Sequence, residues 1–158
     1  FGDWTMTRKE WGARLALVDS TGRMLFTRDA KKGHTKVLGG GGEDGESFEE
    51  ATIREAYQES GGDHKPYSVR LNKKDLIYLD TQDPNDTSGD YGPALAHWFM
   101  AIVEPDVLDS LHEQEGGDDV RSMFVDRVEN AKKLLGHDAW KRFFQDRLQN
   151  KILRHLGM

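Results

Sequence analysis

Cysteine is absent from this 158-residue sequence, and its absence excludes several kinds of chemistry. Without cysteine there are no disulfide bonds, no thiolate zinc sites and no cysteine nucleophiles. Long apolar runs are also missing, because none approaches the roughly 20 residues that span a bilayer and none resembles a signal peptide. We therefore expect no membrane association and, by default, a cytoplasmic location.

An excess of positive charge is missing as well. The formal net charge is -6 at pH 7, with 22 Lys and Arg against 28 Asp and Glu. A general nucleic-acid binder gains affinity from basic side chains that release counterions, so this charge argues against such a partner. A protein of this charge that handles polyanions needs cations to mediate the contact.

Core-forming residues are present in spite of a mean hydropathy of -0.75. Four Trp, seven Phe and four Tyr argue against a disordered chain. With this length and no repeat, linker or low-complexity tract, we expect one domain over residues 1–158. Residues 1–10 are interpreted as an N-terminal extension or a cloning remnant, and the chain is expected to be a monomer or a homodimer.

Segments with the pattern of strands alternate with helical ones along the chain. Ala13 to Asp29 is typical of a β-hairpin, because two apolar segments flank the turn sequence STG. Further strands are predicted at Asp75 to Asp80, at Ala94 to Val103 with both faces buried, and at Val120 to Val125. An apolar residue at every fourth position from Trp140 to Leu156 predicts a C-terminal helix that packs in the core or in a dimer. This mixture indicates an α/β or α+β layered fold.

A glycine run followed by an acidic segment, Leu38 to Gly62, is the most informative part of the sequence. Ser47 and Glu50 fit a capping box, so a helix should begin at Phe48, and the glycine pair after Ser60 should end it. Glycines before a helix allow positive φ angles and close approach of a phosphate. Each feature alone is also typical of a solvated loop and an acidic surface helix.

Within this helix, Glu55, Gln58 and Glu59 lie at i, i+3 and i+4 and therefore share one face. The opposite face should pack against a sheet through Ile53, Ala56 and Tyr57. Like charges one turn apart repel each other, and a divalent cation in a cleft would offset that repulsion. Mg²⁺ takes oxygen ligands and commonly bridges carboxylates to substrate phosphates. The fixed spacing between the glycines and the carboxylates favours a metal-dependent phosphate site.

The spacing resembles the Nudix box of the Nudix hydrolases, G-x5-E-x7-R-E-U-x-E-E-x-G-U, where U is aliphatic. The residues in register with it are Gly40, Glu46, Arg54, Glu55, Glu59 and Gly61. If each match occurs by chance roughly once in fifteen, all six occur together about once in ten million registers. The departures from the motif are Leu38 for a frequent proline, Ala56 and Gly62 at aliphatic positions, and Gln58 for the first glutamate of the pair.

The resemblance covers residues from about Trp11 onward and implies an α/β fold, a Nudix-like α/β/α sandwich with a mixed central sheet. It implies Mg²⁺- or Mn²⁺-dependent hydrolysis of a nucleoside diphosphate linked to another moiety. The metal ligands that it implies are Glu55 and Glu59, with support from Glu46, Gln58 and Gly40. Arg54 is expected to orient a glutamate by a charge-assisted bond, with contact to the substrate as the alternative. The general base is expected at Glu115, with Glu113, Asp118 and Asp119 as rivals.

Substrate identity is only weakly encoded. Gly39, Gly40 and Lys36 are expected to contact a small nucleotide substrate, although the basic stretch from Arg28 to Lys36 could equally be a solvated loop. The proline that marks ADP-ribose hydrolases is absent from its expected place. Tyr78 lies where dinucleoside polyphosphate hydrolases carry a tyrosine, but tyrosine is common in strands. Trp98 and Tyr91 are as consistent with packing as with stacking on a base.

Gln58 leaves two functions open. An amide oxygen can ligate a metal but brings no charge and cannot act as a base. The chain is therefore either a Mg²⁺-dependent phosphoanhydride hydrolase, with catalysis weakened to some degree, or a nucleotide-binding regulatory module with the same fold. Natural drift, a branch of the family with reduced hydrolysis and an engineered change would each explain the glutamine. A purely structural acidic helix does not explain the spacing.

Overall fold

The computed structural model describes residues 11–83, 95–112 and 120–158. Its strands are β1 (Trp11–Asp19), β2 (Arg23–Asp29), β3 (Thr35–Lys36), β4 (Leu38–Gly41), β5 (Ile77–Gln82), β6 (Leu95–Val103) and β7 (Val120–Arg127). Its helices are α1 (Phe48–Ser60), α2 (Pro105–His112), α3 (Ala131–Leu134), α4 (Asp138–Phe143) and α5 (Gln149–His155). A π-helical turn, Phe144–Leu148, joins α4 to α5.

The strands form one mixed sheet in the order β3-β2-β1-β6-β5. β1 and β6 run parallel over their whole length, whereas β2 and β5 pair antiparallel with their neighbours. Two strands lie off this path, because β4 pairs with the first half of β1 and β7 pairs with β2. The edge of β1 therefore changes partner from β4 to β2, which places the glycines of β4 beside the centre of the sheet.

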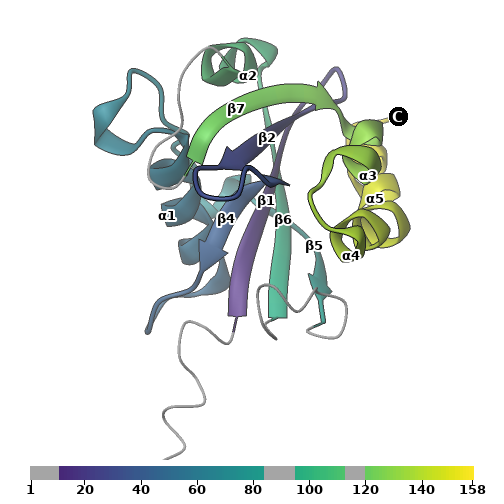
Figure 1. Cartoon of the computed structure of the whole chain (residues 1–158), viewed down its shortest axis with the longest axis horizontal. Coiled ribbons are helices and arrows are strands. Elements are labelled where there is room, and N and C mark those ends of the chain that lie inside the picture. Colours follow the sequence, from purple (N-terminus) through teal and green to yellow (C-terminus); the bar gives the residue numbers. More distant parts are fainter. Residues whose placement is uncertain (1–10, 84–94, 113–119) are drawn as a thin grey trace, which may run out of the picture.

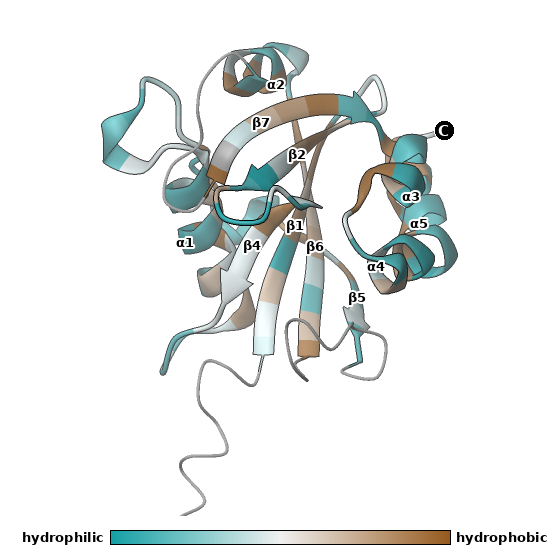
Figure 2. Ribbon diagram, in the orientation of Figure 1, coloured by the Kyte–Doolittle hydropathy of each residue, from teal (hydrophilic) through white to brown (hydrophobic). Residues whose placement is uncertain are grey.

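Helices cover both faces of the sheet (Figure 1). One core lies between the sheet and the α3–α5 region and includes Phe26, Trp98 and Phe144, all almost fully buried. The other lies on the α1 and α2 side, around Leu17 and Leu108. Apolar residues concentrate on the strands, while the outer surfaces of the helices are hydrophilic (Figure 2). This arrangement confirms the predicted α/β/α sandwich with a mixed sheet. Among the described helices, none is long and apolar enough to cross a membrane.

Most predicted elements occur with small shifts. The hairpin forms, and Asp19 stabilises its turn by accepting hydrogen bonds from the amide and hydroxyl of Thr21 and from Arg23. The strand predicted at Asp75 to Asp80 instead spans Ile77–Gln82. Its start moves because the Asp75 carboxylate accepts the Asn72 amide in the capping box of a short 3₁₀ turn, which occupies the residues before the strand.

The predicted C-terminal helix is divided in two by the π-helical turn. Its apolar stripe packs into the core, because Trp140, Phe144, Leu148 and Ile152 are buried. An α-helix turns by about 100° per residue, so a stripe spaced by four drifts by about 40° at each step. The wider π turn offsets this drift and keeps the stripe facing the sheet.

Candidate functional site

The helix that carries the acidic residues has the predicted bounds, Phe48–Ser60. Ser47 accepts a hydrogen bond from the Glu50 amide at 3.1 Å, and Glu50 accepts one from the Ser47 amide at 2.8 Å, so the predicted capping box is present. At the other end Gly61 has φ +154° and donates its amide to the carbonyl of Tyr57. The local cap signals alone thus define this helix.

Gly39 and Gly40 bring the backbone of β4 unusually close to its neighbours. A Cβ atom on Gly39 would lie 2.2 Å from the carbonyl oxygen of Ala13, and the residue has φ +150°. A Cβ atom on Gly40 would lie 2.6 Å from a carboxylate oxygen of Glu55. Glycine is required at position 39, where the backbone of β1 packs against it, whereas at position 40 it leaves room for the acidic side chain of α1.

Glu59 lies on the buried face of α1, which corrects the predicted orientation of the helix. The buried residues of α1 are Ala51, Thr52, Ala56, Glu59 and Ser60, whereas Ile53 and Tyr57 are only half-buried. One oxygen of Glu59 accepts the amide of Gly39 at 2.8 Å. The backbone amide of Gly39 thus holds this carboxyl against β4, so the helix turns a carboxyl inward where Ile53 was expected.

Burial is the main cause that raises the pKa of Glu59 to about 8. The neighbouring Glu55 carboxylate raises it further, while the Gly39 amide lowers it. The positive charges of Lys36 and Arg14 also act on this carboxyl and lower its pKa. Glu59 is therefore a buried carboxyl beside a second carboxylate, with two cations nearby.

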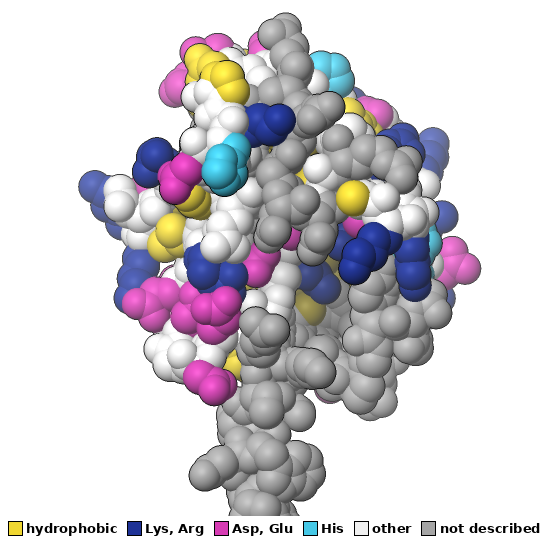
Figure 3. All heavy atoms as spheres, turned by 60° about the vertical axis from the view of Figure 1, so that its left-hand side comes forward, with side chains coloured by type: hydrophobic (Ala, Val, Ile, Leu, Met, Phe, Trp, Pro, Cys, Tyr) yellow, Lys and Arg dark blue, Asp and Glu magenta, His cyan; other side chains and the backbone are white. Residues whose placement is uncertain are grey.

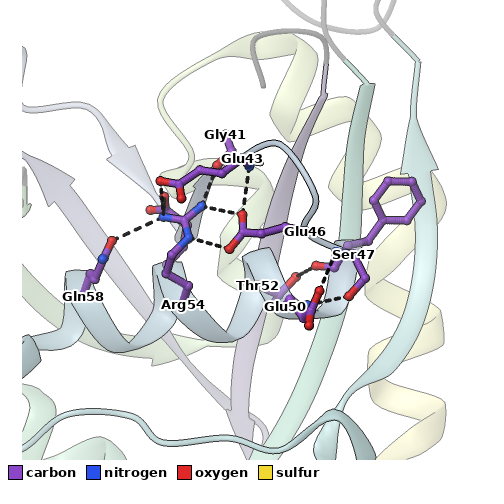
Figure 4. Close-up of polar contacts among 10 residues, drawn as sticks. Gly41, Glu43, Glu46, Ser47, Glu50, Thr52, Arg54 and Gln58 are labelled. Carbon is purple, nitrogen blue, oxygen red and sulfur yellow. Dashed lines mark hydrogen bonds and ion pairs between the residues drawn. The ribbon is translucent and has the colours of Figure 1, made fainter. Parts of the chain in front are cut away.

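Arg54 connects Glu46 with Glu55, and Figure 4 shows its bonds to Glu46. Its Nε and Nη2 donate to the two oxygens of Glu46 at 2.7 and 3.0 Å, and Nη2 also donates to the Gly41 carbonyl at 3.0 Å. Nη1 donates to Glu55 at 2.8 Å. Hydrogen bonds from Arg54 hold the pKa of Glu46 below its ordinary value, although burial opposes them. The guanidinium thus fixes the loop before α1 relative to Glu55.

Gln58 is exposed and belongs to the same network, because its amide oxygen accepts Nη1 of Arg54 at 3.3 Å. This long contact is weaker than the charge-assisted bond between Arg54 and Glu55. The other departure, Gly62, has φ +60°, a left-handed conformation that an aliphatic residue rarely adopts. On the side of the molecule that carries α1, acidic and basic side chains lie next to one another on the surface (Figure 3), and the ion pairs include Arg54–Glu43 and Lys73–Glu50.

Of the other predicted site residues, some lie near Glu59 and others do not. Lys36 is on β3 and close enough to Glu59 to act on its charge. Tyr78 is 54% exposed on β5, where its hydroxyl contacts Thr81 and its ring meets Phe99. Trp98 is buried in the core and donates to Gln82, so stacking on a base is excluded for it. The predicted general base Glu115, its rivals and Tyr91 lie outside the described residues.

Arg14 is a candidate residue that the sequence interpretation missed. It lies directly opposite Gly39 in the β1–β4 pairing, and its guanidinium lies 5.8 Å from the centre of the Trp140 ring. The sequence does indicate a special role for Arg14, because it is the only charged side chain between Trp11 and Val18 in an otherwise apolar segment. Arg14 and Lys36 give the carboxyl of Glu59 a positively charged surrounding.

The oxygen-bearing groups of β4 and α1 are of the kinds that suit a hard cation. Gly40 offers a carbonyl, Glu55 and Glu59 offer carboxyl oxygens, and Gln58 offers an amide oxygen, which are the ligand types that Mg²⁺ prefers. The Glu55 carboxylate raises the pKa of Glu59, an effect that a cation would offset. Within residues 11–83, 95–112 and 120–158, no three acidic or histidine side chains are gathered as a complete metal site. In the described arrangement Glu46 and Glu55 are turned toward Arg54 instead.

The two glycines of β4 should respond differently to alanine. Gly39→Ala is expected to destabilise the fold by about 2 kcal/mol or more, because the new methyl group meets backbone at a positive φ angle. Gly40→Ala should cost less than 1 kcal/mol, roughly a surface-scale effect, because it meets the mobile end of Glu55. Thermal unfolding and Mn²⁺ titration of both variants test this. If Glu55 is a metal ligand, Gly40→Ala should bind Mn²⁺ more weakly than the parent, because the methyl group displaces the carboxylate. Equal binding by the two proteins would contradict this role of Glu55.

Comparison with known proteins agrees with the resemblance described above for residues Leu38 to Gly62. A family model described as the NUDIX domain matches residues 8–146. No curated protein is similar enough in sequence to match.

Solved structures share the fold at low sequence identity. A C. elegans Ap4A hydrolase superposes with a TM-score of 0.61 at 14% identity, covering 92% of this chain and 98% of that one. A bifunctional NMN adenylyltransferase/ADP ribose pyrophosphatase from Francisella tularensis, complexed with AMP and a Mn ion, gives 0.64 at 16% identity over 94% of this chain. This chain spans only 42% of that longer protein. The NUDIX domain of Shewanella oneidensis NrtR, complexed with ADP ribose, gives 0.60 at 13% identity, covering 92% and 88%.

Proposed function

The chain belongs to the Nudix family, and on that premise we propose that it hydrolyses a phosphoanhydride in a nucleoside diphosphate linked to another moiety. The observation that carries the proposal is the position of Glu59, a buried carboxyl beneath the glycines of β4 and beside Glu55. A buried carboxyl with a strongly raised pKa and a specific charged neighbour is typical of functional sites. Its surroundings contain oxygen donors and two cations, which suit a metal and an anionic substrate.

Glu55 and Glu59 would hold Mg²⁺ or Mn²⁺, together with the Gly40 carbonyl and with Gln58 and Glu46 in supporting positions. The ion, when bound, supplies positive charge that polarises the phosphoryl oxygens. Arg54 already binds Glu46 and Glu55, so its role is to orient the carboxylates. The backbone of Gly39 and Gly40 leaves room for close approach of a phosphate.

Lys36 carries a positive charge close to Glu59 and would bind a substrate phosphate. We assign the general base to Glu115, whose carboxylate would take the proton of the attacking water. Tyr78 would contact the leaving part of the substrate if that part extends along the sheet to β5. The F. tularensis and C. elegans proteins act on ADP ribose and on Ap4A, which supports an organic pyrophosphate as the substrate class.

A second function is favoured by Gln58. Its amide contributes no charge to a metal site and bonds Arg54 in the described arrangement. A nucleotide-binding module with little turnover is consistent with this, and the NrtR domain is bound to ADP ribose. Binding without hydrolysis then requires only that the substrate pocket persists while the metal site is weakened.

Gln58→Glu separates the two functions. We expect it to increase turnover by about 10-fold or more, because a fourth carboxylate strengthens metal binding as ligand charge rises. The measurement is phosphate and nucleotide release with Mg²⁺ or Mn²⁺ from nucleoside triphosphates, nucleotide sugars, ADP-ribose and dinucleoside polyphosphates. Glu49→Gln, a change of a carboxylate in the first turn of the same helix, serves as the control.

Turnover by the parent protein that also requires Mg²⁺ or Mn²⁺ would support the hydrolase. Turnover by Gln58→Glu alone would support the binding module. If neither protein releases a product from any substrate, the hydrolase proposal is wrong.

A further inference from the structure

Three aromatic rings meet beneath the beginning of α1. The imidazole of His97 on β6 stacks on the ring of Phe48, with centroids 3.6 Å apart and planes 17° apart. Trp11 on β1 meets both rings edge-on, at 4.9 Å from Phe48 and 6.1 Å from His97. We call these three residues the ring cluster. Its members lie on β1, α1 and β6, which are far apart in the sequence and are brought together by folding.

The sheet register leaves room for this cluster. His97 lies opposite Ala13 on one side and opposite Thr81 on the other. Because Ala13 is small and fully buried, the Phe48 ring can cover the imidazole directly. His97 is therefore buried, at 7% exposure, although Phe48 itself is 41% exposed.

The ring cluster holds both ends of the loop between β4 and α1. At the start of this loop, the Gly42 amide donates to the Trp11 carbonyl at 3.2 Å, and a Cβ on Gly42 would lie 2.0 Å from the Trp11 ring. At the end of the loop, Phe48 is the first residue of α1. Between these points lies Glu46, which accepts two hydrogen bonds from Arg54.

The polar side of His97 connects to the surface through β5. A register shift between Tyr78 and Asp80 brings the side chains of Tyr78 and Thr81 to the same face of the strand. The Thr81 hydroxyl contacts Nδ1 of His97 at 3.1 Å and the Tyr78 hydroxyl at 2.5 Å. Nε2 of His97 is buried and has no hydrogen-bond partner among the described residues.

We propose that His97 is a positioning residue of this site, which in its neutral form fixes the loop 42–47 through Phe48 and so holds Glu46 and Arg54 in place. The proposal rests on the proposed function only where it concerns turnover. Its structural part, that His97 orders the loop, stands on the ring contacts and the register.

Protonation of His97 would weaken this arrangement. Burial lowers the pKa of His97 below its ordinary value, so the ring is neutral at pH 7. An imidazolium would be attracted to the aromatic ring faces, but its Nε2–H would lack an acceptor and its charge would lie at the positive end of α1. Acid should therefore loosen the stack.

Within the part of the chain that the structure describes, the elements packed against His97 turn few other ionisable groups toward it. β1 presents Trp11 and Ala13, α1 presents Phe48, and β5 presents Thr81 with the Tyr78 hydroxyl behind it. The charged residues next to these are Arg14 on β1, Glu49 and Glu50 on α1, and Asp80 on β5. Arg14 lies over Trp140, Glu50 bonds Ser47, and Asp80 is paired with Arg147 and Lys151.

The test compares His97→Ala, His97→Phe and Phe48→Ala by amide hydrogen exchange of residues 42–47. We expect faster exchange in His97→Ala and in Phe48→Ala, whose side chain is 41% exposed. His97→Phe should show parental exchange at pH 7, because that variant keeps the stacked ring. As the pH falls below the pKa of His97, the protection factors of these amides, which correct for the pH dependence of intrinsic exchange, should decrease in the parent but not in His97→Phe. Ile102→Ala, an exposed position on the same strand, is the matched control.

The kinetic counterpart is a decrease of kcat by about 10- to 100-fold in His97→Ala with KM changed little, since misplacement of a supporting group acts on the chemical step. His97→Phe should restore most of this loss at pH 7. Parental exchange at 42–47 in both His97→Ala and Phe48→Ala would overturn the proposal. A parent without any turnover would contradict the proposed hydrolysis, while the exchange data would still decide the role of His97.

Discussion

Replacing Glu59 with glutamine is expected to stabilise the metal-free protein and at the same time to abolish hydrolysis. The amide retains an oxygen that can accept the Gly39 amide at the present 2.8 Å. It also removes an ionisable group whose pKa burial raises to about 8. A gain of stability with a loss of function is the behaviour of a residue that is retained for its chemistry.

The pH dependence of this effect follows from the direction of the shift. A carboxyl that is harder to ionise when folded contributes fully to stability below its unfolded pKa, and this contribution declines as the pH rises toward about 8. The advantage of Glu59→Gln should therefore be small at pH 4 and about 2 to 4 kcal/mol at pH 8. Unfolding in denaturant with EDTA, at a series of pH values, measures it.

Metal and activity measurements complete this prediction. Mg²⁺ or Mn²⁺ should raise the melting temperature of the parent but not of Glu59→Gln, because binding to the folded state alone stabilises it. The value of kcat/KM should fall about 1000-fold, or about 4 kcal/mol of transition-state stabilisation. Glu49→Gln is the control, with unchanged activity. Equal stabilisation of parent and Glu59→Gln by metal would show that Glu59 is not a ligand.

The bounds of α1 could be predicted from sequence because they depend on neighbouring residues. Ser47, Glu50 and Gly61 satisfy backbone groups within one turn of the helix ends, so their identity is sufficient. The burial of Glu59 could not be predicted in this way. It depends on β4 passing over the helix at Gly39, a contact between residues 20 positions apart, and a carboxylate on a helix is ordinarily exposed.

The strands likewise depend on neighbouring residues, whereas the ring cluster depends on residues that are distant in the sequence. β6 was predictable as a buried strand from its nearly continuous apolar run, which Glu104 follows directly. The stacking of Phe48 on His97 requires the parallel pairing of β1 with β6, in which Ala13 lies opposite His97. A histidine in an apolar strand does not indicate which helix covers it. The contact between His97 and Phe48 therefore could not be predicted from the sequence.

Arg54→Lys is expected to reduce kcat/KM by about 100-fold or more, although the charge is conserved. Arg54 donates through three nitrogens to Glu46, Glu55 and the Gly41 carbonyl in one plane. A lysine ammonium has no such planar fork and cannot reproduce this geometry. Loss of these contacts releases both Glu55 and the loop that carries Glu46. Supporting residues of metal ligands typically contribute 10- to 100-fold.

The stability of Arg54→Lys separates an orienting role from a substrate-binding one. Arg54 is only 21% exposed and its partners are partly buried. Removing the fork should therefore destabilise the metal-free protein by about 2 to 3 kcal/mol. A residue that only binds substrate would change KM and leave unfolding unaltered. The matched control is Arg70→Lys. Arg70 is exposed, and its guanidinium lies over the ring of Tyr57, a residue of α1. Unaltered stability together with a raised KM would place Arg54 on the substrate instead of the carboxylates.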